Sequence, residues 1–176
     1  MLADDFESYK LNVLALQETH MKGYGAINIT SNKGKNYTLY YSGSKTKSEN
    51  GVGIILPSDV NANFQPFCDR TCQITIKGSS EQKIHLICAY APTLDRSEKN
   101  PDMRENFYTQ LDSILRKISS RDVVIIAGDF NAKTGSAKKD KIYQQNIGKY
   151  GKGQINTNGT HLLSFACNNN LKLTNT

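Results

Sequence analysis

Apolar residues along this 176-residue chain fall into short runs that polar segments separate. Short apolar runs bounded by turn-forming residues are typical of β-strands. Glycine, asparagine and lysine dominate residues 21–36, which predicts a loop or an irregular strand pair there. The runs predict strands over residues 12–16, 37–41, 52–56, 72–77, 83–90 and 123–126.

Two pairs of these strands are expected to be antiparallel neighbours. Strands 37–41 and 52–56 flank a polar loop that ends in Asn50-Gly51, a dipeptide favoured in hairpin turns. Strands 72–77 and 83–90 flank the polar turn 78–82. Hairpins of this kind build antiparallel parts of a sheet.

A stripe of apolar residues with helical spacing marks residues 100–119 as the clearest helix. Asn100 suits its N-cap and Pro101 its first position. A helix ending over residues 6–10, a helix over 161–170 and a last strand over 171–176 are also expected. Strands, hairpins and helices in this order predict a mixed sheet system with helical cover. The stripe consists of Phe107, Leu111, Ile114, Leu115 and Ile118.

Residues 122–135, DVVIIAGDFNAKTG, carry the most informative combination of strand and polar side chains. The run 123–126 predicts a strand that is buried on both faces. Gly128 lets the backbone turn, and Asp129 and Asn131 follow in the loop. Ligands of sheets with helical cover gather at the carboxyl ends of strands, so a site is expected there.

Two other strands also end in polar side chains. Glu18 follows strand 12–16, and Tyr90 ends strand 83–90 just before Pro92. Each has a structural alternative, because a buried glutamate often pairs with a lysine or arginine and a tyrosine often closes a core with its hydroxyl in water.

Composition narrows the class of protein. The apolar fraction is 38%, and no run approaches the roughly 18 residues of a membrane helix. The first residues, MLADDFESYK, do not resemble a signal peptide, so a nuclear or cytoplasmic, non-secreted protein is expected. The formal net charge of +6 is compatible with a polyanionic partner or with a solvated basic surface. The length fits one domain over residues 1–176, and nothing indicates an oligomer.

The cysteines raise the question of a zinc site. Cys68 and Cys72 precede His85 and Cys88 with spacings that superficially resemble a zinc motif. His85 and Cys88 are an odd number of positions apart in a predicted strand, so their side chains should point to opposite faces. Free thiols in the core are therefore the preferred interpretation, also for Cys167.

The polar residues at the strand ends suit phosphodiester chemistry. Mg²⁺ takes a few oxygen ligands and keeps several waters, and Mn²⁺ is an alternative. Glu18 would bind the metal, and Asp129 would orient or deprotonate water. Asn131 and Tyr90 could hydrogen-bond a phosphate oxygen without adding charge.

The sequences of the motifs support phosphodiester chemistry. LALQETH, GVGIIL, ICAYAPT, AGDFNAKTG and NTNG followed by an apolar helix occur in order. From residue 12 onward the chain resembles the endonuclease/exonuclease/phosphatase superfamily. More narrowly, it is similar to the endonuclease domain of non-LTR (LINE-type) retrotransposons and to craniofacial development protein 2-like sequences.

The resemblance implies a four-layer α/β/β/α sandwich of two mixed sheets with outer helices. It also implies metal-dependent cleavage of a phosphodiester, with DNA nicked at a target site for reverse transcription. By motif position, Glu18 matches the metal-binding Glu, Tyr90 the active-site Tyr, Asp129 the water-activating Asp and Asn131 the phosphate-orienting Asn. Asp129 and Asn131 also match a second metal position.

The chain departs from the family pattern at both ends. The family begins with a strand that supplies an Asn to the site, and it ends with an Asp in an I-D-Y or I-D-H segment and a terminal S-D-H. None of these is found in the sequence. We therefore expect a partial domain with an unpaired sheet edge and exposed core. A non-catalytic remnant that binds nucleic acid or protein, and a phosphatase of the same superfamily, are the alternative functions.

The missing motifs predict that this chain cleaves plasmid DNA weakly or not at all with Mg²⁺, although its parent reading frame encodes a nuclease. A plasmid-nicking assay checks this. Robust cleavage that Asp129→Ala abolishes would contradict the expectation.

Overall fold

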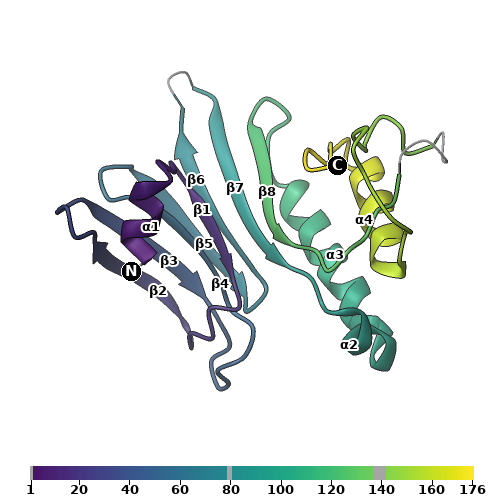
Figure 1. Cartoon of the computed structure of the whole chain (residues 1–176), viewed down its shortest axis with the longest axis horizontal. Helices are drawn as coiled ribbons and strands as arrows, with labels where there is room; N and C mark the ends of the chain where they lie inside the picture. The colour runs from purple at the N-terminus through teal and green to yellow at the C-terminus, as the bar shows by residue number, and fades with distance from the viewer. Residues whose placement is uncertain (1, 79–80, 137–141) are drawn as a thin grey trace. The chain divides into compact units, whose positions relative to one another are not determined.

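The described part of the chain, residues 2–78, 81–136 and 142–176 of the computed structural model, contains two four-stranded sheets (Figure 1). The chain divides into two units. Unit 1 comprises Met1–Tyr90 and Ser119–Gly128, and unit 2 comprises Ala91–Ile118 and Asp129–Thr176. The assignment of residues 1–176 to a single domain stays a prediction.

Sheet A has the strand order β1-β4-β3-β2 and is antiparallel throughout, so the expectation of two mixed sheets is wrong for this sheet in the described residues. The predicted pairing of strands 37–41 and 52–56 is confirmed as β3 with β4. The alternatives of a loop or an irregular strand pair for residues 21–36 are wrong, because β2 is one regular strand paired with β3 along its whole length. Its side chains are exposed or half-buried, so no apolar run marks it. The strands are β1 (Leu14–Gln17), β2 (Tyr24–Thr30), β3 (Asn36–Ser42) and β4 (Val52–Pro57).

Sheet B has the order β5-β6-β7-β8 and is mixed. The predicted antiparallel pairing of β6 with β7 is confirmed. Strand β8 is parallel to β7, because Lys83 N donates to Asp122 Oδ1 at one end and Gly128 lies against Ala89 O at the other. Strand β5 was not predicted. The strands are β5 (Ala62–Cys68), β6 (Thr71–Lys77), β7 (Lys83–Tyr90) and β8 (Val123–Asp129).

Side chains that alternate between the two faces of the strands in unit 1 form two apolar layers. Residues of β4, β6 and β7 such as Ile54, Ile74 and Cys88 form the core between the sheets. Helix α1 (Leu2–Ser8) buries Phe6 against Tyr37 on the outer face of sheet A, with ring centroids 4.8 Å apart. The predicted α/β sandwich class is therefore confirmed.

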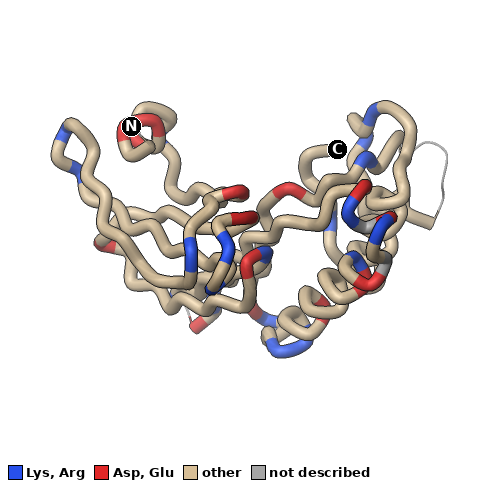
Figure 2. Tube along the Cα trace, turned by 90° about the horizontal axis from the view of Figure 1, so that it is seen from below, with Lys and Arg blue, Asp and Glu red and all other residues tan. Residues whose placement is uncertain are grey.

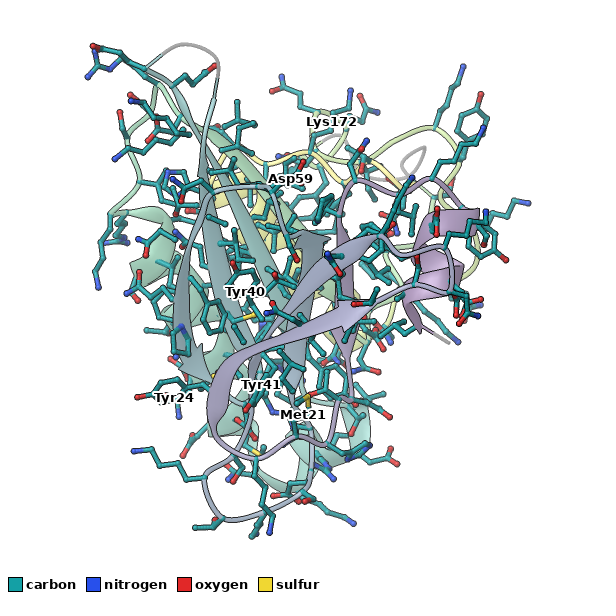
Figure 3. All side chains as sticks on the ribbon, turned by 90° about the vertical axis from the view of Figure 1, so that its left-hand side faces the viewer. Met21, Tyr24, Tyr40, Tyr41, Asp59 and Lys172 are labelled. Carbon is teal, nitrogen blue, oxygen red and sulfur yellow. The ribbon has the colours of Figure 1, made fainter. Side chains whose placement is uncertain are left out.

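Strand β3 shows how one strand serves both layers (Figure 3). Tyr40 packs against the core between the sheets, and its ring lies 5.3 Å from that of Phe64 on β5. Tyr41 is directed to the opposite face, where a Cβ added to Gly25 would lie 3.1 Å from its hydroxyl.

The odd spacing of His85 and Cys88 has the predicted effect. Cys88 lies opposite Cys72 in the core between the sheets, and both are free thiols. Their mutual hydrogen bond and their burial raise the pKa of the Cys72 thiol. His85 lies on the other face, where Nε2 is 3.2 Å from Asp122 Oδ2. The Lys83 backbone N–H and the His85 ring hold the pKa of Asp122 below its ordinary value.

Strand β8 corrects one prediction. The run 123–126 was expected to be covered on both faces, but Val123 is 39% and Ile125 47% exposed. Val123 and Ile125 alternate along the strand, so they share one face of β8, and this face is left partly uncovered at the last strand of sheet B in the described residues. Ile125 borders an apolar cavity of about 320 Å³ whose lining includes Ile54 and Leu86.

Unit 2 contains the helices α2 (Leu94–Lys99), α3 (Pro101–Leu115) and α4 (Thr157–Asn168). Helix α3 confirms the predicted helix from residue 100 but ends before 119, and Asn100 makes no side-chain capping hydrogen bond. Tyr108 of α3 packs against Phe165 of α4 with ring centroids 5.3 Å apart.

Two further expectations concern the end of the chain and the membrane. The last strand, 171–176, is wrong, since Leu173 makes just an isolated bridge to Ile147. Lys138, Lys139 and Lys141 of the basic segment, and residues 79–80 of the turn 78–82, lie outside the described residues. Among the described helices, none has the length and apolar character needed to cross a membrane.

Gly128 offers a test of the fold. Its φ is +152°, and a Cβ there would lie 1.8 Å from Ala89 O, so Gly128→Ala should lower the free energy of unfolding by about 3 kcal/mol or more. Gly34→Ala is the control, because Gly34 has φ +83° but open space around it and should cost only about 1 kcal/mol. Urea unfolding measures both, and equal losses would contradict the close approach of β7 and β8.

Candidate active site

Glu18 follows the last residue of β1 in a strained backbone conformation. Its φ is +54°, a region that non-glycine residues rarely occupy. The residues after it are fixed, because Thr19 N donates to Gly51 O at 3.1 Å and His20 N to Asn50 O at 2.9 Å. Strain that neighbouring hydrogen bonds maintain is a feature of functional sites.

Tyr90 joins the core of unit 1 to Glu18. The residue is 6% exposed and belongs to the core between the sheets. Its hydroxyl donates a hydrogen bond of 2.5 Å to Glu18 Oε1, a short distance typical of a charged acceptor. The structure therefore brings together two of the four predicted site residues, and both lie in unit 1.

The carboxylate of Glu18 retains binding capacity. It is exposed, and among the described residues no donor contacts Oε2. A carboxylate with one oxygen held by a phenol and the other open to solvent can accept a hard cation without losing its orientation.

Asp129 and Asn131 lie in unit 2 and form a second pair. Asn131 N donates to Asp129 Oδ1 at 2.7 Å, which makes a tight turn, and Asn131 has φ +47°. Asn131 Nδ2 donates to Ala91 O at 2.9 Å, and Ala91 N donates to Asp129 O at 2.8 Å. These bonds leave Asp129 Oδ2 and Asn131 Oδ1 without a donor among the described residues.

The NTNG motif, residues 156–159, supports this turn. Asn158 is 2% exposed, and its Nδ2 donates to Asn131 O at 3.1 Å and to Pro92 O at 3.0 Å. Gly159 allows a close approach, because a Cβ there would lie 1.9 Å from Lys133 O. The motif therefore holds the segment that carries Asp129 and Asn131.

Asn156 completes the support. Its side chain caps α4 by accepting from Gly159 N at 2.7 Å, and it also accepts from Lys133 N at 3.0 Å. Sequence reasoning quoted this motif but gave its residues no role in the site. It also missed Arg70, a buried arginine beside Tyr90. The only signal in the sequence that could have indicated Arg70 is a charged residue close to a predicted strand.

The charges and ligand geometry limit what these residues can bind. Figure 2 shows that basic and acidic residues are interspersed along the chain. Within residues 2–78, 81–136 and 142–176, no three His, Cys, Asp or Glu side chains are grouped to hold a metal. Taken separately, Glu18 in unit 1 and the Asp129 and Asn131 pair in unit 2 offer the oxygen donors that a hard cation such as Mg²⁺ prefers, and Mg²⁺ needs few protein ligands because it keeps its waters.

Comparison with known proteins defines the class. A model of the Endonuclease/Exonuclease/phosphatase family matches residues 1–163 of the chain. The match covers most of the chain, so the protein belongs to this family.

Individual relatives share part of their length with it. Craniofacial development protein 2 of Bos taurus is 29% identical over 180 residues, which cover 100% of this chain and 28% of the relative. The protein of the same name from Tragulus javanicus is 28% identical, with 100% and 29% covered. The chain thus spans little more than a quarter of the length of these relatives.

Two solved structures are similar at low identity. The crystal structure of ANGEL2, a 2′,3′-cyclic phosphatase, in complex with adenosine-2′,3′-vanadate has a TM-score of 0.46 at 13% identity, covering 82% of this chain and 46% of that one. The human Nocturnin catalytic domain with bound sulfate has a TM-score of 0.42 at 12% identity, covering 75% and 56%.

Asn158 tests the support of the turn in unit 2. Asn158→Ala removes the donor to two carbonyls, so we expect unfolding to become easier by about 2–3 kcal/mol and amide exchange around residue 131 to accelerate. Asn168→Ala, at the exposed end of α4, is the control and should change neither. Urea unfolding and hydrogen exchange measure the two effects. Unchanged exchange at Asn131 in Asn158→Ala would contradict the role of this side chain.

Proposed function

We propose that the protein is a DNA-nicking phosphodiesterase of retrotransposon origin that depends on a divalent cation, Mg²⁺ or Mn²⁺. Membership of the Endonuclease/Exonuclease/phosphatase family supports the reaction class. The observation that carries the proposal is the 2.5 Å hydrogen bond from Tyr90 to Glu18, because it fixes one carboxylate oxygen and leaves the other for a cation.

Each residue has a distinct role in the proposed reaction. Glu18 would hold the cation, and a bound cation would neutralise the charge that develops on the phosphate. Tyr90 holds the carboxylate through its hydroxyl. Asp129 orients or deprotonates the attacking water through Oδ2, and Asn131 contributes an amide oxygen and a remaining N–H toward cation or phosphate.

DNA is proposed as the substrate because of the net charge of the chain and the sequences of its motifs. The net charge is +6, and phosphate contacts by lysine and arginine supply most of nonspecific DNA affinity. The sequence similarity to craniofacial development protein 2 fits the retrotransposon-like motifs AYAPT and NTNG. A phosphomonoester or phosphoinositide substrate is the alternative within the same reaction class.

A single-turnover nicking assay tests the proposal. The missing terminal motifs allow weak cleavage or none, and the proposal requires the first of these. With the 176-residue chain in excess over supercoiled plasmid, we therefore expect slow nicking that requires Mg²⁺ or Mn²⁺ and stops with EDTA. Glu18→Gln and Asp129→Asn should each reduce the rate by roughly 10²-fold or more, because they remove charge while keeping shape. Asp59→Asn is the matched control, since Asp59 is an exposed carboxylate of unit 1 (Figure 3) and should not affect the rate.

Two outcomes would overturn the proposal. One is the absence of any metal-dependent nicking by the unmodified chain. If that chain nevertheless binds DNA with a steep salt dependence that Glu18→Gln leaves unchanged, a non-catalytic nucleic-acid-binding function is the better description. The other is a substrate panel in which a phosphomonoester or phosphoinositide is cleaved faster than plasmid. That result would indicate a phosphatase of the same family instead of a nuclease.

A further inference from the structure

Arg70 is a buried charge that the proposed reaction does not use directly. It lies between β5 and β6 in unit 1 and is 8% exposed. Burial of a guanidinium is unfavourable unless its N–H groups are hydrogen-bonded and its charge is compensated. The contacts of Arg70 therefore indicate why the fold keeps an arginine at this position.

One set of contacts fixes Tyr90. Arg70 Nη1 donates to Tyr90 O at 3.2 Å, and Arg70 Cζ lies 5.1 Å from the centroid of the Tyr90 ring. The backbones are also joined, because Tyr90 N donates to Arg70 O at 2.8 Å. A guanidinium that stacks on the ring and hydrogen-bonds the carbonyl of the same residue restricts both its backbone and its side-chain orientation.

A second set of contacts extends to the residues beside Glu18. Arg70 Nη2 donates to Asn50 Oδ1 at 3.0 Å, and Asn50 Nδ2 donates to Asp69 Oδ2 at 2.7 Å. Asn50 O in turn accepts from His20 N at 2.9 Å, two residues after Glu18. The guanidinium of Arg70 thus contacts two residues that support Glu18. One is Tyr90, whose hydroxyl donates to Glu18, and the other is Asn50, which holds the backbone just after Glu18.

We propose that Arg70 is a positioning residue that holds the Tyr90 hydroxyl on Glu18. The geometry requires a fork of N–H groups in one plane, which arginine has and lysine lacks. The structural part of this inference stands on contacts within unit 1, and its kinetic part rests on the proposed function.

The structural part can be measured without catalysis. Carbon-13 at Cζ of tyrosine reports the phenol's hydrogen bonding, and Tyr90→Phe assigns the Tyr90 resonance. We expect Glu18→Gln to shift this resonance in the otherwise unmodified chain, because the charged acceptor is lost. In the Arg70→Lys variant, Glu18→Gln should shift the Tyr90 resonance by less than half as much. Arg116→Lys is the control, since Arg116 is an exposed arginine of α3's end and should preserve the full shift.

The kinetic part uses a double-substitution cycle in the nicking assay. Arg70→Lys should lower kcat roughly tenfold with little change in KM, as expected when one or two hydrogen bonds that orient a group are lost. If Arg70 acts through Tyr90, the chain with both Arg70→Lys and Tyr90→Phe should be no slower than Tyr90→Phe alone. An arginine needed just for stability would instead give multiplicative losses.

The outcomes separate this inference from the proposed function. An undiminished Tyr90 shift in the Arg70→Lys background overturns the positioning role, whether or not the chain cleaves DNA. A diminished shift without any cleavage supports the positioning role and overturns the proposed function. Arg70→Lys keeps the buried charge, so it is expected to fold, and its unfolding midpoint is compared with that of Arg116→Lys before either readout is interpreted.

Discussion

The hydrogen bond between Tyr90 and Glu18 depends on almost every layer of unit 1. The ring of Tyr90 belongs to the apolar core between the sheets, while its hydroxyl reaches a carboxylate at the end of β1 in sheet A. Tyrosine suits this position because one end is apolar and the other forms hydrogen bonds. The packing of two sheets thereby sets the orientation of one polar group.

Unit 2 fixes its own polar pair by a different means. Its turn at residues 129–131 is held by hydrogen bonds to Ala91 and from Asn158, instead of by an aromatic ring in a core. A buried asparagine can satisfy two carbonyl groups at once, which a backbone N–H cannot. Glu18 and Asn131 both have positive φ, so in each unit the candidate residue has an uncommon backbone conformation that surrounding hydrogen bonds maintain.

The carboxylate oxygens of Glu18 and Asp129 that accept no hydrogen bond from the described residues are the atoms available for chemistry. In each pair one carboxylate oxygen accepts a hydrogen bond from within the same unit, and the second is left for solvent, a cation or substrate. Carboxylates whose orientation is fixed in this way are suited to catalysis, because little reorganisation is needed when charge develops. Membership of the Endonuclease/Exonuclease/phosphatase family is consistent with such an arrangement.

The amino-acid sequence by itself determined the elements with strong periodicity and the family. The hairpins β3–β4 and β6–β7, helix α3 and the polar residues at three strand ends all follow from local pattern, because alternation and helical spacing are local properties. The tertiary structure alone decided the rest. Strand β2 exists through pairing with β3 and not through burial, and one face of β8 is left partly uncovered. The roles of Arg70 and Asn158 come from contacts with residues far away in the chain. Such contacts depend on which strands become neighbours, and that information is not contained in any short stretch of sequence.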